Sequence, residues 1–155
     1  MAEYDILIKG GTIVDGTRTP RYVSDLAVKD GKIAKIGGLR GSGATKVLDA
    51  SGLIVAPGFV DLHTHYDAQI FWDPWATPSS LHGVTSMVMG NCGFALAPCR
   101  PEQQEWLARC LEAVEDIPVE AMMAGINWTW ETFPQYLDNV EKLPKAINYG
   151  AFLGH

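Results

Sequence analysis

The sequence has few cysteines, few charges and no long apolar run, and each shortage excludes a class of protein. Three cysteines in 155 residues, without an export signal, predict free thiols and no disulfide framework. Charged residues are 19% of the chain, the formal net charge is -6 and no basic run occurs, so we expect neither a nucleic-acid nor an anionic-membrane partner. No apolar stretch reaches the roughly 20 residues of a membrane span. We therefore expect a cytoplasmic protein.

What the sequence does contain is enough apolar material for a core, since 47% of its residues are hydrophobic. Residues 1–52 alternate short apolar segments with turns and predict a small antiparallel sheet, the N-terminal β-segment of the protein. The clearest hairpin joins residues 25–29 to residues 32–36 through Asp30-Gly31, a pair typical of a type I′ turn. Its predicted apolar face consists of Val28, Ile33 and Ile36.

A second region, residues 53–155, has a different pattern. Three nearly unbroken apolar runs, 53–62, 83–89 and 146–153, predict strands that are buried on both faces. Segments with helical periodicity lie between the second and third runs. This alternation predicts βα units around a parallel sheet, in which chemistry takes place beyond the carboxyl ends of the strands.

Two helices are predicted between these strands. Pro101 begins one at a favoured first-turn position, and its apolar stripe is predicted to contain Trp106, Leu107, Cys110, Leu111 and Val114. Thr132 and Gln135 form a possible capping box for the other. The predicted inner face of that helix contains Phe133, Tyr136, Leu137 and Val140.

A His-x-His motif follows the first buried run directly. In extended chain, residues i and i+2 point the same way, so the imidazoles of His63 and His65 can face one point. Two neutral imidazoles that converge in this way suit Zn²⁺ or a similar divalent metal. Asp61 could lie beneath them as a hydrogen-bond acceptor. The alternative is a chance motif whose histidines make ordinary hydrogen bonds.

Cys92 follows the second buried run, next to Gly93. Its thiolate would be a good Zn²⁺ ligand, and metal binding itself favours deprotonation of a thiol. The alternative is a small buried apolar residue, which is the common fate of a free cysteine. Because His63 and His65 end the neighbouring strand, we favour the ligand. Cys99 and Cys110 are assigned to packing.

Polar and aromatic residues near these strand ends are candidates for a substrate pocket, because an acid, an amide and aromatics beside a metal suit one. Asp67 could instead support a ligating histidine, and Trp72 could simply pack its loop. A histidine after the third run could touch substrate or be an ordinary terminal residue. The pocket candidates are Asp67, Gln69, Trp72 and His155.

These motifs resemble the amidohydrolase superfamily and, within it, the D-aminoacylase or N-acyl-D-amino-acid deacylase group. The superfamily resemblance rests on Pro57-Gly58-Phe59-Val60-Asp61-Leu62-His63-Thr64-His65 and Gly83-Val84-Thr85. The narrower one rests on His65-Tyr66-Asp67-Ala68-Gln69, Trp72-Asp73-Pro74, His82-Gly83-Val84-Thr85, Gly90-Asn91-Cys92-Gly93, Ile126-Asn127-Trp128 and Gly154-His155.

The resemblance implies an α/β fold: an N-terminal β-sandwich segment, residues 1–52, followed by the first three βα units of an incomplete (β/α)₈ TIM-type barrel, residues 53–155. It implies that His63, His65 and Cys92 bind one or two Zn²⁺ ions, or another divalent metal, and that metal-activated water deacylates a small N-acyl-D-amino acid. A barrel needs roughly 250 residues. We therefore expect an N-terminal fragment, inactive and poorly soluble alone, whose general-base aspartate lies beyond residue 155.

Two other functions fit the same motifs. One is a cyclic-amide hydrolase of the dihydropyrimidinase or dihydroorotase type, although such enzymes resemble the segment around Cys92 less well. The other is a non-catalytic metal-binding module, which predicts that the 155 residues fold as a soluble monomer.

Overall fold

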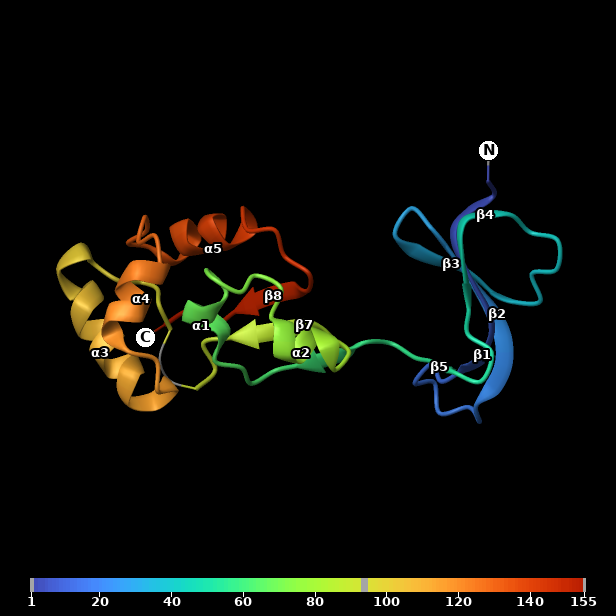
Figure 1. Ribbon diagram of the computed structural model, residues 1–155, viewed down its shortest axis with the longest axis horizontal. Coiled ribbons are helices and arrows are strands. Elements are labelled where there is room, and N and C mark those ends of the chain that lie inside the picture. The colour runs from blue at the N-terminus through green and yellow to red at the C-terminus, as the bar shows by residue number, and fades with distance from the viewer. Residues whose placement is uncertain (1, 93–94, 155) are drawn as a thin grey trace. The chain divides into compact units, whose positions relative to one another are not determined.

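The computed structural model describes residues 2–92 and 95–154, and the chain divides into two compact units between Pro57 and Gly58 (Figure 1). The first unit contains β1 (Tyr4–Ile13), β2 (Tyr22–Lys29), β3 (Lys32–Gly37), β4 (Ala44–Asp49) and β5 (Ile54–Val55). The second contains β6 (Phe59–Asp61), α1 (Tyr66–Gln69), α2 (Thr77–Leu81), β7 (Val84–Met89), η1 (Pro101–Gln103), α3 (Gln104–Glu115), α4 (Val119–Gly125), α5 (Phe133–Glu141) and β8 (Asn148–Ala151).

The first unit is one sheet in the order β3-β2-β1-β4, with β5 also paired to β1. β2 runs antiparallel to both of its neighbours, whereas β4 and β5 run parallel to β1. The sheet is therefore mixed, and the expectation of a purely antiparallel sheet was wrong. Local turn signals predict hairpins well, but the direction of β4 and β5 depends on long connections that carry no such signal.

The predicted hairpin is present between β2 and β3. Asp30 and Gly31 both have positive φ, at 51° and 71°, as a type I′ turn requires. Val28 pairs with Ile33 and Ala27 with Lys35, so Ala34 is an extra residue in β3. Because a bulge shifts the alternation by one residue, positions 33 and 36 come to the same face of the sheet.

β1 is a single strand of 10 residues, although it contains the pair Gly10-Gly11. Gly10 has a φ of 67°, and the register with β2 shifts between Ile8 and Gly11, so the glycine pair forms a bulge instead of a turn. The Asp25 carboxylate accepts the Gly10 N–H at 2.9 Å and the Leu39 N–H at 3.2 Å. One side chain thus satisfies two backbone groups outside the strand pairing.

The second unit confirms the prediction of parallel strands joined by helices. β6, β7 and β8 pair in that order, all parallel. The expected single strand over 53–62 is instead divided, because Pro57-Gly58 interrupts it: β5 belongs to the first sheet and β6 to the second. Burial on both faces was also wrong for β6, since Phe59 is 67% and Val60 62% exposed. β6 is an edge strand, and no described residue covers these side chains.

The predicted helices correspond to α3 and α5, whereas α1, α2 and α4 were not predicted. On α3 the core residues are Ala108 and Leu111, and Trp106 is 65% exposed, so the predicted stripe was displaced. On α5 the Gln135 side chain accepts the Thr132 N–H at 2.9 Å, as the capping box requires. Its core residues are Tyr136 and Val140, and Leu137 is 39% exposed.

The core of the second unit lies between the sheet and these helices. Its largest side chains with under 2% exposure are Ile70, Met87, Met89, Leu96, Leu111, Met122 and Tyr136. In Figure 1 the arrowheads of β7 and β8 point toward the side on which α3 and α4 lie. These two helices therefore stand at the carboxyl ends of the strands. Within the described ranges, none of the helices combines the length and apolar character needed to cross a bilayer.

Candidate metal centre

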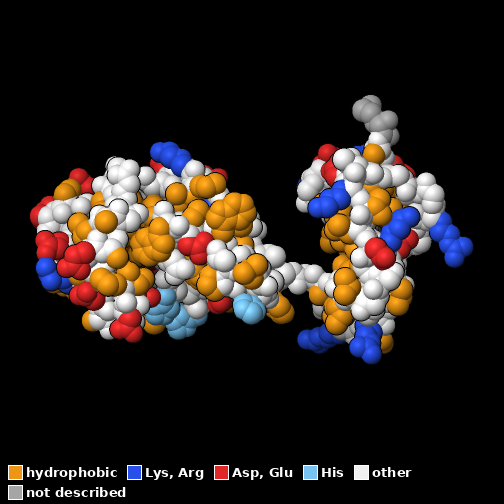
Figure 2. Space-filling model, in the orientation of Figure 1, with side chains coloured by type: hydrophobic (Ala, Val, Ile, Leu, Met, Phe, Trp, Pro, Cys, Tyr) orange, Lys and Arg blue, Asp and Glu red, His pale blue; other side chains and the backbone are white. Residues whose placement is uncertain are grey.

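The two histidines of the predicted motif lie side by side just beyond β6. Their rings are nearly parallel, with 12° between the planes and 5.7 Å between the centroids. The backbone N–H of His63 donates to the Asp61 carboxylate at 3.1 Å, which fixes the start of the loop. Asp61 thus binds the backbone, and not an imidazole. His63 is exposed and His65 half-buried, and pale-blue histidine surface is visible on this unit in Figure 2.

Cys92, beyond the end of β7, lies close to both rings. One ligand atom each from His63, His65 and Cys92 can be chosen so that all three lie within 4.8 Å of one another. Zn–N distances of about 2.0–2.1 Å and Zn–S distances of about 2.3 Å place the ligand atoms of one ion closer together than this limit. The three side chains therefore lie near the spacing of a common cation, and a small convergence of the side chains completes it. Imidazole and thiolate are ligands that suit zinc. The donor set therefore fits a zinc-like ion.

Hydrogen bonds join the loop after β6 to the end of β7. The Thr64 hydroxyl donates to the Val88 carbonyl at 2.9 Å, and the Asn91 side-chain amide donates to the Leu62 carbonyl at 2.7 Å. Thr64 is 5% exposed although it lies between the two exposed or half-buried histidines. It therefore holds the motif to the neighbouring strand. Neither role was predicted, because the burial of Thr64 and the contact of Asn91 with the preceding loop depend on the fold.

The side chain of Asp67 is bound to the loop that follows β7. Its side chain is 5% exposed, and its carboxylate accepts the Gly90 N–H at 3.0 Å. Burial raises the pKa of Asp67 to about 6. Gly90 has a φ of 76°, and a Cβ there would come within 3.1 Å of the Phe152 carbonyl oxygen. Asp67 thus binds the backbone that leads to Cys92.

One acid close to the histidines was not predicted. Glu115, the last residue of α3, has a carboxylate oxygen 2.7 Å from Nδ1 of His65. Fifty residues separate the two positions, so no local pattern could have paired them. The available signal was weaker: Glu115 continues the spacing of Leu107 and Leu111 on the inner side of α3, where an apolar residue is expected.

Gln69 and Trp72 line one cavity of about 420 Å³, together with Ile117, Ala121 and Gly125. The Trp72 ring lies against the backbone of α4, since a Cβ on Gly125 would be 2.9 Å from it. Gln69 is one helical turn beyond His65, and Ile117 is two residues beyond Glu115. The cavity is therefore bounded by the segments that flank the His65–Glu115 contact. Asp67 does not line it, and His155 lies outside the described residues.

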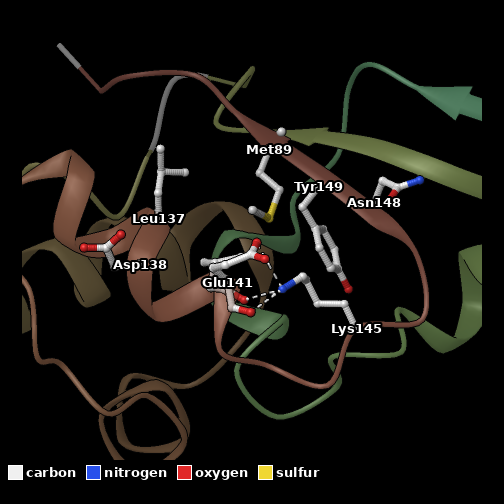
Figure 3. A pocket seen from close by; sticks show the side chains of 9 residues that line it. Met89, Leu137, Asp138, Glu141, Lys145, Asn148 and Tyr149 are labelled. Carbon is white, nitrogen blue, oxygen red and sulfur yellow. Dashed lines mark hydrogen bonds and ion pairs between the residues drawn. The ribbon is translucent and has the colours of Figure 1, made fainter.

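A second cavity, of about 460 Å³, lies between α5 and β8 (Figure 3). Figure 3 shows Lys145 among its lining side chains, directed toward the end of α5. The Lys145 ammonium donates to the Val140 and Glu141 carbonyls at 3.1 and 2.6 Å, and it lies 3.4 Å from the Glu141 carboxylate. The lysine therefore caps the helix, a structural role. The lining of this second cavity includes none of the candidate ligands His63, His65 and Cys92.

Comparison with known proteins shows the family of the chain. A family model described as the amidohydrolase family matches residues 46–155. The chain belongs to the amidohydrolase family. It is 38% identical over 152 residues to a D-aminoacylase of Alcaligenes xylosoxydans xylosoxydans, covering 98% of this chain and 29% of that protein.

Among solved structures, this amidohydrolase chain resembles an N-acyl-D-glutamate deacylase of Bordetella bronchiseptica that was crystallised with zinc and a phosphonate inhibitor. The TM-score is 0.78 and the identity 35%, over 98% of this chain and 30% of that one. A D-hydantoinase gives a TM-score of 0.52 and 25% identity, over 95% and 26% of the two chains. The chain thus spans about 30% of the length of the deacylases it matches.

Proposed function

We propose that this chain forms part of the metal-dependent active site of a hydrolase that deacylates N-acyl-D-amino acids. The observation that carries the proposal is the convergence of His63, His65 and Cys92 within 4.8 Å, at the carboxyl ends of two neighbouring parallel strands. Catalytic groups of βα barrels lie at that end. Two of the three side chains are exposed, so substrate can reach the cluster.

His63, His65 and Cys92 would hold the metal, which in such hydrolases polarises the scissile carbonyl and lowers the pKa of a bound water to about 7. Residues around the candidate ligands contribute by holding the two ligand loops in a fixed arrangement. The bonds from Thr64 and Asn91 fix the spacing of the two loops before any metal binds. Preorganised ligands bind with a smaller loss of conformational entropy, so we expect tight binding.

The deacylase substrate is favoured by two independent features. The similarity to the deacylase structure, with a TM-score of 0.78, exceeds that to the hydantoinase, with 0.52. In addition, the cavity lined by Gln69 and Trp72 is mainly apolar and has one amide, which suits the acyl chain or side chain of an N-acyl amino acid. A hydantoin ring is a smaller and more polar group.

Metal binding tests the site directly. Titration of the chain with Co²⁺ is expected to give the charge-transfer absorption of a cobalt–thiolate bond, and equilibrium dialysis is expected to retain zinc. Cys92→Ser is expected to abolish the absorption and His63→Ala to weaken binding. Cys110→Ser is the matched control, because Cys110 lies on α3 outside the cluster. Two results would contradict the proposed ligands: a wild-type chain that shows no cobalt–thiolate absorption, or a Cys92→Ser variant that still shows it.

The substrate is tested separately, in the whole protein. We expect release of the amino acid from N-acyl-D-amino acids, with slower turnover of the L-enantiomers, and no opening of hydantoins. The reverse preference would establish the cyclic-amide alternative. Metal binding without turnover of either substrate class would favour a non-catalytic module.

A further inference from the structure

The contact between Glu115 and His65 joins α3 to the candidate metal centre. Nδ1 of His65 and a carboxylate oxygen of Glu115 are 2.7 Å apart, the distance of a strong, charge-assisted hydrogen bond. The side chains are 36% and 15% exposed, respectively. An ionised carboxylate only accepts hydrogen bonds, so a hydrogen bond to it from this ring requires a proton on Nδ1.

The position of Glu115 is unfavourable for a carboxylate for two reasons, its place at the end of a helix and its low exposure. It is the last residue of α3, where the helix dipole is negative and repels a carboxylate. It also continues the inner stripe of Leu107 and Leu111, so its side chain is largely withdrawn from water. A carboxylate in such a place destabilises the fold unless a specific partner compensates it. His65 is the one hydrogen-bond partner of the Glu115 carboxylate among the described residues.

The end of α3 is held firmly. Asp116 follows in the left-handed conformation, with a φ of 53°, and its N–H donates to the Glu112 carbonyl at 3.1 Å. The Glu112 carboxylate accepts the Val119 N–H at 3.2 Å, which ties α3 to the first turn of α4. Glu115 therefore approaches His65 from a fixed helix pair.

We propose that Glu115 is a positioning residue that accepts the Nδ1 proton of His65 and thereby leaves Nε2 as the metal-binding nitrogen. The inference rests on the proposed metal site, and it adds which nitrogen of His65 binds and why. Carboxylate–histidine–metal arrangements orient the ring and raise the basicity of the coordinating nitrogen. The hydrogen bond between Glu115 and His65 thus connects the α3–α4 pair to the candidate metal centre.

The first test needs no metal. Long-range ¹H–¹⁵N correlation spectra of the metal-free chain report which ring nitrogen of each histidine is protonated. We expect His65 to be in the Nδ1–H form, and Glu115→Ala to convert it to a mixture of the two forms. His82, which is exposed and has no ring hydrogen bond to a described residue, is the internal reference. Predominance of the Nε2–H form of His65 in the wild-type chain would overturn the proposal.

The second test measures affinity for zinc with a competing chelator. Loss of a supporting acceptor weakens metal binding by about 10–100-fold in comparable sites, and we expect a loss in this range for Glu115→Ala. Glu115→Gln keeps an acceptor oxygen and is expected to lose less. The control, Glu105→Gln, removes the same charge from the exposed side of α3, where Glu105 pairs with Arg109.

The outcomes separate this inference from the proposed function. Equal zinc affinity in wild type, Glu115→Ala and Glu105→Gln would refute the role of Glu115 and leave the metal site intact. Wild type that binds no zinc, but has the Nδ1–H form of His65 that Glu115→Ala abolishes, would refute the metal site and preserve the contact. If circular dichroism shows that Glu115→Ala is unfolded, the proposal is tested by the tautomer of His65 in the wild-type spectrum and by the zinc affinity of Glu115→Gln.

Discussion

The two units of the chain owe their stability to different kinds of interaction. The second unit has a core of sixteen buried apolar residues, whereas the first has a cluster of three, Leu7, Ala27 and Leu39. Several apolar side chains of the first sheet are more than 60% exposed, among them Val23, Ile33 and Ile54. The first unit therefore depends on strand pairing, turn conformation and side-chain bonds to the backbone, and the second on packing.

This difference determines where the chain can carry a site. A packed core fixes the strand ends of the second unit, so the loops at residues 62–65 and 90–92 can hold the candidate ligands in a defined geometry. The first sheet lacks such support. A useful feature separates the two units experimentally: all five tryptophans lie in the second, so their fluorescence reports on that unit alone.

The largest effect is expected from removal of Tyr136, in the centre of the second core. Its ring is 1% exposed, packs against Phe71 and Trp130, and its hydroxyl donates to the Asp67 carbonyl at 3.2 Å. Tyr136→Ala is expected to lower the free energy of unfolding by about 3–5 kcal/mol, as measured by tryptophan fluorescence in urea. Zinc affinity is expected to fall as well, because the Asp67 segment loses its anchor.

Tyr136→Phe keeps the ring and removes the hydroxyl, so a loss of about 1 kcal/mol is expected. Equal losses in the two variants would show that the hydrogen bond, and not packing, dominates the second unit.

The next effect concerns the first unit and its dependence on pH. Hydrogen bonds from the Gly10 and Leu39 N–H groups hold the pKa of Asp25 below its usual range. A lowered folded-state pKa contributes stability that is fully present above the unfolded value, about 3.9, and is lost as the pH falls through the folded value. We expect Asp25→Asn to destabilise the first sheet at pH 7 and to flatten its loss of stability below about pH 4.

Far-UV circular dichroism and amide exchange at residues 10 and 39 measure this effect. Asp49→Asn is the control, because the one described partner of the Asp49 carboxylate is Ser51, two residues further on, and the pKa of Asp49 is also lowered. A control variant that destabilises the sheet as much as Asp25→Asn would show that the long-range bonds of Asp25 carry no special stability.

A smaller effect is expected at the hairpin turn. Gly31 has a φ of 71° and open space around it, so Gly31→Ala introduces backbone strain without a clash. The expected cost is about 1 kcal/mol, seen in circular dichroism of the sheet but not in tryptophan fluorescence. A simultaneous shift of both signals would mean that the two units unfold together.

The same contrast explains what the sequence could predict. The hairpin at Asp30-Gly31, the capping box at Thr132 and the three parallel strands follow from local patterns, and all are present. The proximity of the candidate ligands His63, His65 and Cys92 was predictable because alternation and strand ends place side chains at one edge. Position and direction of β4 and β5, and the short helices α1, α2 and α4, depend on long-range contacts or on turns that lack periodicity.

The supporting residues of the site were least predictable. Glu115 contacts His65 from fifty residues away, and Asp67, in α1, accepts the Gly90 N–H in the segment that leads to Cys92. Neither pairing has a local signal. Exposed apolar residues such as Phe59 were also misjudged, because an apolar run indicates a tendency to be buried and does not reveal what covers it.

The smallest effect is therefore expected at β6, where that misjudgement can be tested. Phe59 is 67% exposed, so Phe59→Ser should change the free energy of unfolding of the chain by no more than about 0.5 kcal/mol, measured by tryptophan fluorescence. Leu81→Ser is the matched control, at 79% exposure. A loss of several kcal/mol for Phe59→Ser alone would mean that Phe59 is covered in solution. Sedimentation would then show whether a second copy covers it, since an unpaired edge strand favours association.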